Sequence, residues 1–406
     1  MKILCVVDEY PWPSRSGYRQ RLHWLLTLLS AHGELDLLVV GKRAESEQLA
    51  PPPADLALNR LLVVQGGQVT THRLVRLARW ILGRRPRALL GRDWSQAQTA
   101  AAGWSRTGYD VTWFSHSPLY LALGGILLAP HVVDLDNLES SSLQHRRLRR
   151  MRADSTSERL RQSVQRQLDK RDERRWRRLE LLIARRAAAT VVCSELDLAR
   201  LNRPRTHVVP NGYEPTADEL PARVQTPLPV LVMVGLLTYE PNRDAAAFFA
   251  REVLPRVRHS VPDARFRVVG RYGSEHDVQA LRGLPGVEVV GEVDAVTAEL
   301  SAAAVAVAPI RFGGGTRIKI LEAMAHGLAV VTTTVGCEGL ETVPGRHLIV
   351  GDTAEEMAAG CVALLVDDQL RAEVGDAGRD LWQRRYRWRA MDAAVTEVLR
   401  SASREG

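Results

Sequence analysis

The feature that most constrains this chain is a glycine-rich turn set between two short apolar runs. Residues 303–309 and 328–331 have the length and composition of buried strands. The sequence between them contains Arg311-Phe-Gly-Gly-Gly-Thr-Arg-Ile-Lys-Ile-Leu-Glu, in which Ile318 and Leu321 begin a helical pattern. Strand, turn, helix and strand in this order predict a parallel βαβ unit, which is stable only in a sheet that helices cover.

The turn itself has the properties of an anion site. Gly313, Gly314 and Gly315 carry no Cβ, so a ligand can approach the backbone closely. Thr316 is a suitable N-cap for the helix that follows. A helix start presents unpaired N–H groups and a positive dipole end, and both favour phosphate.

Charged side chains in the same stretch also favour an anion site, and one of them suggests that the anion is part of a nucleotide. Arg311, Arg317 and Lys319 add positive charge around the turn. Glu322 follows about 9 Å along the helix axis, at a rise of about 1.5 Å per residue, and leans back toward the turn. A diphosphate at the turn with its ribose on Glu322 fits this spacing. The alternative is an ordinary tight turn before a core helix, with Glu322 on a solvated face.

The same residues resemble the nucleotide-sugar signature of glycosyltransferase family 4, the retaining enzymes with the GT-B fold. The usual form is Glu-X7-Glu, and Glu322 matches the second Glu, which binds the ribose in that family. Gly314 stands where the first Glu is expected. A branch of the family carries Gly-Gly-Gly-Thr-Arg-Ile-Lys-Ile-Leu-Glu instead, and there backbone amides replace the first carboxylate.

Alternating strand and helix patterns also occupy both ends of the chain. An apolar run at 2–7, a helical pattern with leucines on one face, and a second run at 35–40 predict another βαβ unit. Its first loop leads to Gly17, which either lets a phosphate or sugar approach or belongs to a plain connecting loop. The loop lacks Gly-x-Gly-x-x-Gly, which argues against a dinucleotide-dependent redox enzyme.

Polar residues follow two further predicted strands of this first half. His116 closely follows the run at 110–114, and the resemblance places such a histidine on the acceptor side, facing the anomeric carbon of the donor. A satisfied loop histidine is the alternative. Asp134, Asp136 and Asn137 end the run at 127–135 and are predicted to bind acceptor hydroxyls, although Asn137 is equally suited to capping the next helix.

The second half departs from the family at the two basic residues that usually hold the diphosphate. The run at 230–234 ends at Gly235, but the Arg and Lys that usually follow it are replaced by Leu236 and Pro241. Arg271, after the run at 265–269, is therefore predicted to supply charge together with Arg311 and Lys319.

A loop near the end of this half adds one more donor candidate. Glu338, after the run at 328–333, resembles a residue near the nucleobase and is otherwise an exposed loop residue.

Composition narrows the class of protein further. The chain has 406 residues, 45% of them hydrophobic, and only four cysteines, none at redox or metal spacing. No apolar stretch is long enough for a membrane span, and the N-terminal run is too short for a signal peptide, so we expect a cytoplasmic protein. Tyr213 to Pro229 is rich in proline and predicts a linker.

The positive charge is concentrated in one segment. Residues 146–186 contain 16 Lys/Arg against six Asp/Glu, a net +10 beside +8 for the whole chain. The segment predicts long helices whose charges form a solvated face, or else attract an anionic acceptor or the inner leaflet of a membrane. No zinc finger or helix-turn-helix accompanies it, so nucleic acid is not expected as a partner.

The resemblance implies two Rossmann-like domains with parallel sheets facing across a cleft. Residues 1–214, with a C-terminal helix at 386–406 crossing back, would bind the acceptor, and residues 215–385 the nucleotide sugar. The expected reaction is retaining transfer of a sugar to a hydroxyl on a glycan, a lipid-linked acceptor or a small molecule, without metal or cofactor. His116, Arg311 and Lys319 are the predicted catalytic residues. The alternatives are a nucleotide-sugar epimerase and a catalytically silent partner protein of the same architecture.

Overall fold

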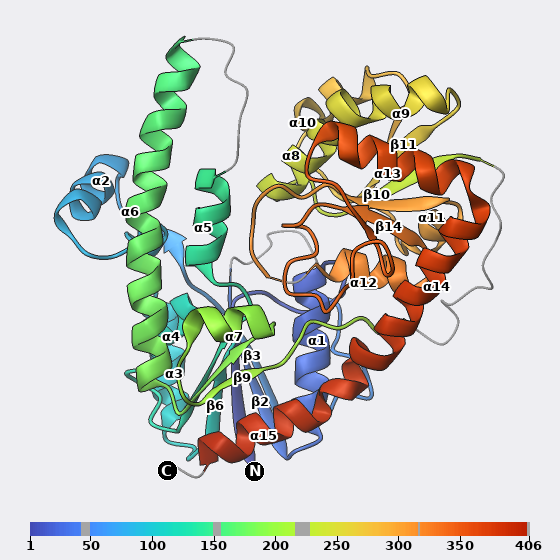
Figure 1. The fold of residues 1–406 in the computed structure, drawn as a ribbon. Coiled ribbons are helices and arrows are strands. Elements are labelled where there is room, and N and C mark those ends of the chain that lie inside the picture. The colour runs from blue at the N-terminus through green and yellow to red at the C-terminus, as the bar shows by residue number, and fades with distance from the viewer. Residues whose placement is uncertain (42–48, 149–155, 216–227, 316, 404–406) are drawn as a thin grey trace. The chain divides into compact units, whose positions relative to one another are not determined.

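The computed structural model describes residues 1–41, 49–148, 156–215, 228–315 and 317–403. The chain divides into two compact units, Met1–Pro210 with Met391–Gly406, and Asn211–Ala390. Each unit contains a parallel sheet with helices on it (Figure 1), so the predicted α/β class with two Rossmann-like sheets is confirmed.

The chain changes unit at slightly different positions from the predicted 214/215 and 386. The Tyr213 amide donates to the Tyr386 carbonyl at 2.9 Å, and the Trp382 indole donates to the Tyr213 carbonyl at 3.0 Å. These bonds hold residues 211–215 and the aromatic residues at 382–388 to the second unit. Most of the predicted linker, residues 216–227, lies outside the described residues.

The sheet of the first unit has seven strands in the order β3-β2-β1-β6-β7-β8-β9, and every neighbouring pair is parallel. The strands are β1 (Lys2–Val7), β2 (Glu34–Gly41), β3 (Arg60–Gln65), β6 (Val111–Phe114), β7 (His131–Leu135), β8 (Ala189–Val192) and β9 (Thr206–Val208). The central strands β1, β6 and β7 are almost wholly buried, as apolar runs in a covered parallel sheet should be. Their carboxyl ends therefore meet at one edge, the usual ligand side of such sheets.

Helices surround this sheet. They are α1 (Gly17–Ser30), α2 (Arg73–Leu82), α3 (Ser95–Ser105), α4 (Ser117–Leu123), α5 (Glu139–Leu148), α6 (Thr156–Arg186), α7 (Glu195–Leu201) and α15 (Asp392–Ser403), with a short antiparallel pair β4 (Gln68–Val69) and β5 (Arg92–Asp93). Over the described ranges, none of the helices combines the length and apolar character needed to cross a membrane.

The edge strand β3 was not predicted from the sequence. Its residues alternate between half-buried and exposed. Its register is fixed by neighbours, because Asp36 of β2 accepts a 2.8 Å hydrogen bond from the Arg60 Nε and another at 2.6 Å from the Tyr109 hydroxyl. The formation of β3 therefore depends on its contacts with neighbouring elements and not on its local sequence pattern.

The second unit repeats the arrangement with a six-stranded parallel sheet in the order β12-β11-β10-β13-β14-β15. Its strands are β10 (Val230–Val234), β11 (Arg265–Val269), β12 (Val287–Gly291), β13 (Val305–Ala308), β14 (Ala329–Thr332) and β15 (Ile349–Val350). Its helices are α8 (Glu240–Phe248), α9 (Leu254–Ser260), α10 (Glu275–Arg282), α11 (Thr297–Ser301), α12 (Ile318–Ala325), α13 (Ala354–Val366) and α14 (Asp368–Arg385). β13, the glycine turn, α12 and β14 follow one another as predicted.

Candidate functional site

The glycine turn of the second unit connects the carboxyl end of β13 to α12. Gly313 has φ +119° and Gly315 has φ +72°, values that favour glycine. A Cβ on Gly313 would also lie 2.9 Å from the Arg317 Nη2. The helix begins at Ile318, directly after an extended Arg317. Thr316, the predicted N-cap, lies outside the described residues.

Arg317 is a buried cation at the start of α12. Its side chain is 9% exposed, and its Nη1 donates to the Gly314 carbonyl at 2.6 Å. The buried Nε has no hydrogen-bond acceptor among the described residues. A buried polar N–H without an acceptor is unfavourable, so the turn is suited to an anion that would accept from this guanidinium.

Lys319 approaches the same region from the first turn of α12. Its Nζ donates to the Asn242 Oδ1 at 2.6 Å, and the Asn242 amide donates to the Leu236 carbonyl at 2.9 Å. Gly235 allows this approach, because a Cβ there would lie 2.7 Å from the Lys319 Nζ. Burial, together with the charge of Arg317, lowers the pKa of the Lys319 ammonium to about 7.

Asn242 was not predicted as a site residue. It lies in the first turn of α8, directly after Pro241, and it is buried although it is polar. Its side chain joins the loop after β10 to α12 by holding the lysine ammonium. One sequence signal could have identified Asn242. It is a polar residue next to the position where the resembling family has its lysine.

Arg311 has a different environment from the one predicted. Its guanidinium donates two hydrogen bonds to the Asp244 carboxylate, at 3.0 and 2.8 Å, and lies 4.3 Å from the centroid of the Phe248 ring. A carboxylate already balances its charge, so Arg311 contributes less net positive charge to the turn than the sequence suggested. Its catalytic role stays a prediction.

The remaining donor-side candidates also belong to the second unit. Glu322 is only 6% exposed on α12, so the alternative of a solvated face does not describe it. Arg271 is exposed directly after β11, and Glu338 is half-buried in the turn after β14. Their contacts to a nucleotide stay predictions.

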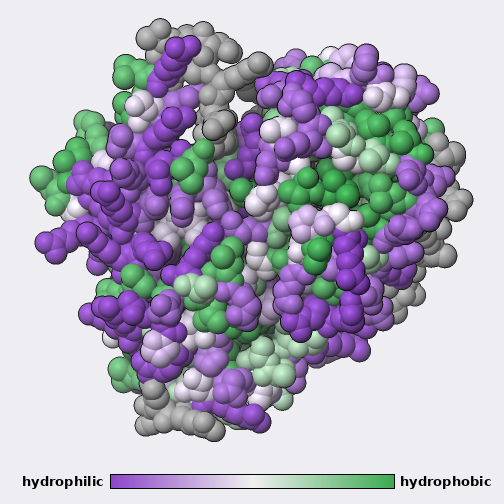
Figure 2. Space-filling model, viewed as in Figure 1, coloured by the Kyte–Doolittle hydropathy of each residue, from purple (hydrophilic) through white to green (hydrophobic). Residues whose placement is uncertain are grey.

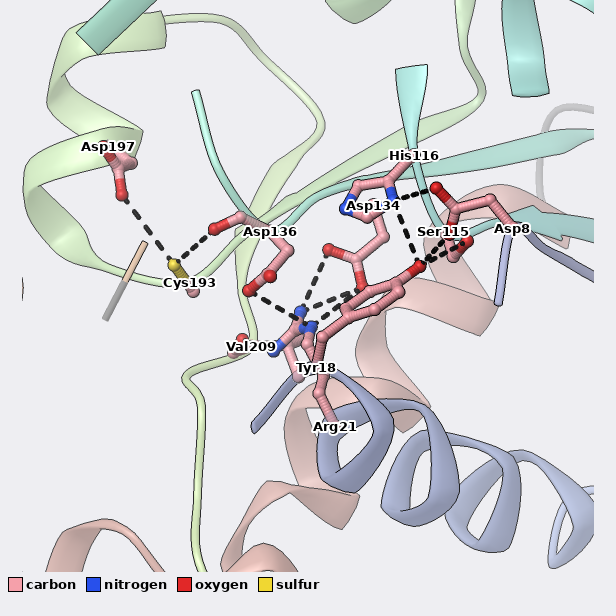
Figure 3. Close-up of polar contacts among 10 residues, drawn as sticks. All are labelled: Asp8, Tyr18, Arg21, Ser115, His116, Asp134, Asp136, Cys193, Asp197 and Val209. Atoms are coloured by element: carbon pink, nitrogen blue, oxygen red, sulfur yellow. Dashed lines mark hydrogen bonds and ion pairs between the residues drawn. The ribbon is translucent and has the colours of Figure 1, made fainter. Parts of the chain in front are cut away.

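A second polar cluster lies at the carboxyl ends of β1 and β6 in the first unit (Figure 3). The His116 Nδ1 lies 2.9 Å from the Asp8 Oδ2 and 3.0 Å from the Tyr18 hydroxyl. Tyr18 also donates to the other Asp8 oxygen, lies 3.1 Å from the Ser115 Oγ, and stacks on the imidazole at 4.7 Å between ring centroids. Tyr18 directly follows Gly17, which begins α1 and is half-buried.

These contacts make His116 a cation at neutral pH. Burial disfavours the imidazolium, but the Asp8 carboxylate outweighs it and raises the pKa of His116 to about 9. The imidazolium in turn lowers the pKa of Asp8 despite the opposing effect of burial. A protonated imidazole donates hydrogen bonds and cannot take a proton, so His116 is suited to electrostatic and positioning roles and not to a general base.

Arg21 organises the residues at the end of β7. Its guanidinium donates to both Asp134 oxygens at 2.9 Å, lies 3.5 Å from the Asp136 carboxylate, and donates to the Val209 carbonyl at 3.2 Å. Both members of the Arg21–Asp134 pair are about 2% exposed. Burial still raises the pKa of Asp134 to about 6, against the effect of Arg21.

The three predicted acceptor residues differ in their partners and in their exposure. Asp134 binds Arg21, whereas the Asn137 amide donates to the Ser142 hydroxyl at 3.1 Å, near the start of α5. Asp136 keeps 17% of its side chain exposed, against 2% for Asp134, and is the more open of these two carboxylates. Arg21 itself was missed, although its position four residues before the buried Leu25 places a charge on the apolar face of α1 and so requires a buried partner.

Within the described ranges, no group of three or more His, Cys, Asp or Glu side chains is arranged to hold a metal ion. Metal independence of the reaction stays a prediction.

Parts of the chain are similar to a known protein family and to known proteins. Residues 228–367 match the family described as Glycosyl transferases group 1. A phosphatidyl-myo-inositol mannosyltransferase of Mycolicibacterium smegmatis is 33% identical over 212 residues, 49% of this chain and 52% of that protein.

Two further proteins resemble the chain. A GDP-mannose-dependent monoacylated alpha-(1-6)-phosphatidylinositol monomannoside mannosyltransferase of Corynebacterium glutamicum is 30% identical over 164 residues, 38% of this chain and 43% of that protein. The match thus spans about half the length of these curated relatives. Sucrose-phosphate synthase from Thermosynechococcus elongatus has the same fold, with a TM-score of 0.69 at 17% identity over 100% of both chains.

Proposed function

Because residues 228–367 match the group 1 glycosyltransferases and the whole chain has the GT-B type of fold, we propose that this protein transfers a sugar from a nucleotide diphosphate to a hydroxyl acceptor with retention of configuration. The observation that carries the proposal is the turn at Gly313–Gly315, where the buried Arg317 and the half-buried Lys319 lie beside the start of α12. The second unit then holds the donor and the first unit the acceptor.

On the donor side, the diphosphate lies against the glycine turn. It accepts from the Arg317 Nε and from the Lys319 ammonium, two cations whose repulsion an anion relieves. These groups stabilise the charge that develops on the leaving diphosphate, and such electrostatic stabilisation is usually the largest single catalytic effect. Glu322 accepts from the ribose hydroxyls. The β-phosphate of the leaving group takes the acceptor proton, so no protein carboxylate need serve as the nucleophile.

On the acceptor side, His116 and Asp136 position the hydroxyl that attacks. The imidazolium donates a hydrogen bond while Asp8 and Tyr18 hold its Nδ1 side, which fixes the direction of the ring. Asp136 accepts from another hydroxyl of the acceptor. Asp134 keeps Arg21 in place and contributes by positioning, not by contact with the substrate.

The relatives suggest which substrates to test first. The names of both mannosyltransferases specify phosphatidylinositol-based acceptors, and one specifies GDP-mannose. We therefore expect GDP-mannose as the donor and a lipid-linked inositol or sugar hydroxyl as the acceptor, with the protein working at the inner membrane face.

Two measurements test the proposal. Thermal unfolding with GDP-, UDP- and dTDP-sugars should show one nucleotide that raises the melting temperature, because a bound ligand stabilises the folded state by mass action. The stabilising donor, incubated with lipid acceptors, should give a product whose new anomeric bond keeps the donor configuration, as seen by NMR. Donor conversion without acceptor would instead indicate an epimerase, and binding without turnover a silent partner protein.

We expect Glu322→Gln to raise the donor KM about tenfold or more with little change in kcat, because hydrogen bonds to a charged group contribute about 1.5–3 kcal/mol. The substitution keeps the size of this buried side chain. Steady-state kinetics with varied donor measure it. Glu355→Gln, an exposed change on α13 of the same unit, is the control and should leave KM unaltered. An unchanged KM in Glu322→Gln would remove the ribose assignment.

Donor binding should take up a proton above pH 7. The pKa of Lys319 is lowered to about 7, so the free enzyme loses this positive charge as the pH rises above that value. A bound diphosphate raises the pKa of the ammonium again, which makes donor affinity fall with rising pH and stay constant well below 7. Calorimetry with an intact nucleotide sugar in buffers of different ionisation enthalpy measures the uptake. Lys319→Met should abolish it, and an equal uptake in that variant would contradict the assignment.

A further inference from the structure

Helix α2 (Arg73–Leu82) presents its apolar side to solvent. The exposed fractions are 67% for Leu74, 47% for Leu77, 50% for Ile81 and 87% for Leu82. These residues follow the i, i+3, i+7, i+8 spacing that an ordinary surface helix turns toward its core. Figure 2 shows hydrophobic residues at the position of α2, at the left edge of the view.

A single tryptophan fixes this orientation. Trp80 is the only buried residue of α2, and its indole donates to the Asp172 Oδ1 of α6 at 2.6 Å. The guanidinium groups of Arg171 and Arg175 lie 4.7 and 5.1 Å from its ring centroid. The Arg175 Nη2 also donates to the Trp80 carbonyl at 2.8 Å. The side of α2 that carries Trp80 is therefore held against α6, and the leucine side is held outward.

The charges around this apolar side are positive. Residues 73–87 contain six arginines and no Asp or Glu. Arg73, Arg79, Arg84 and Arg85 are exposed, whereas Arg87 pairs with Asp169 and Asp172 of α6.

On the long helix α6, too, exposed cations outnumber exposed acids. Its carboxylates Asp169, Asp172 and Glu180 are buried and engaged, the last with Ser140 at 3.0 Å. Its cations include several that are exposed, namely Arg166, Lys170, Arg174, Arg177 and Arg178. Because these three acids are buried and Glu173 pairs with Arg147, the outer surface of this segment is more positive than its composition alone suggests, although residues 149–155 of the basic segment lie outside the described residues.

We propose that α2 is an in-plane anchor for an anionic lipid bilayer. Its exposed leucines and isoleucine insert among the acyl chains, while the arginines of α2 and the cations of α6 contact lipid phosphates. An amphipathic helix with a cationic polar side binds such an interface through buried apolar area and charge together. The sequence pointed to residues 146–186 for membrane contact, but the apolar part of the surface lies on α2, outside that segment. The inference does not depend on the transfer reaction, because binding is measured without donor.

The test is co-sedimentation of the full chain with vesicles. We expect binding to phosphatidylcholine vesicles that contain phosphatidylglycerol, and at least about tenfold weaker binding to phosphatidylcholine alone, since each basic residue near an anionic surface contributes about 1 kcal/mol. Leu74→Gln/Leu82→Gln should weaken binding to the anionic vesicles about tenfold or more, because polar groups replace inserted apolar ones.

A matched variant provides the control. Leu128→Gln/Val366→Gln changes two residues of similar exposure, 86% and 65%, and should bind vesicles like the unaltered protein. Both variants should keep the unfolding midpoint of the unaltered protein, because all four side chains are exposed. Equal vesicle binding by the two variants would overturn the proposal. So would an oligomer in lipid-free solution that only Leu74→Gln/Leu82→Gln dissociates, since the apolar side of α2 would then be a protein interface.

Discussion

Lys319→Met should lower kcat about a hundredfold or more while the protein stays folded. The ammonium lies at the start of α12, next to the turn where the leaving diphosphate is proposed to bind. Removing one preorganised donor to developing negative charge costs about 10²–10³ in kcat. Single-turnover measurements with saturating donor and acceptor isolate this effect, and methionine preserves the volume of the side chain.

Arg311→Met is the informative comparison for that experiment. Because Asp244 already neutralises Arg311, we expect a loss of kcat well below that of Lys319→Met. If the two variants lost activity equally, Arg311 would have to leave Asp244 when the donor binds. An unaltered kcat in Lys319→Met would remove this residue from the catalytic assignment.

Arg21→Met should lower the free energy of unfolding of the first unit by about 3–5 kcal/mol at neutral pH, because it leaves the buried Asp134 carboxylate without its counter-charge. The pH dependence has a definite sign. Burial already raises the pKa of Asp134 to about 6, and removing Arg21 raises it further. A carboxyl group whose pKa is higher in the folded protein binds more protons when folded, so the deficit grows as the pH rises above about 6, where Asp134 ionises in the unaltered protein, and is smallest below that pH.

Urea unfolding at several pH values measures this deficit. Arg19→Met is the control, because Arg19 lies on the same helix and pairs with Glu9 in a partly exposed position, where we expect about the 0–1 kcal/mol of a solvent-exposed ion pair. The double variant Arg21→Met/Asp134→Leu should recover much of the loss by removing both buried charges. A deficit in Arg21→Met no larger than that of the control would show that the pair does not stabilise the unit.

The candidate site was partly predictable. The glycine turn, Arg317, Lys319 and Glu322 could be named as candidates because they are close together in sequence, and a turn followed by a helix has local signals. Asn242 and Arg21 were missed because each acts on a residue far along the chain. Asn242 meets Lys319 across 77 positions, and Arg21 meets Asp134 across 113.

The sequence by itself determined the two parallel sheets and the place of the glycine turn, because apolar runs, helical spacing and glycine are local properties of the chain. Only the tertiary structure decided which charges are available. It paired Arg311 with Asp244 and Asp134 with Arg21, and it turned the leucines of α2 outward by holding Trp80 against α6. The physical reason is that the effective charge or exposure of a side chain depends on neighbours brought together by folding, and a single sequence does not list those neighbours.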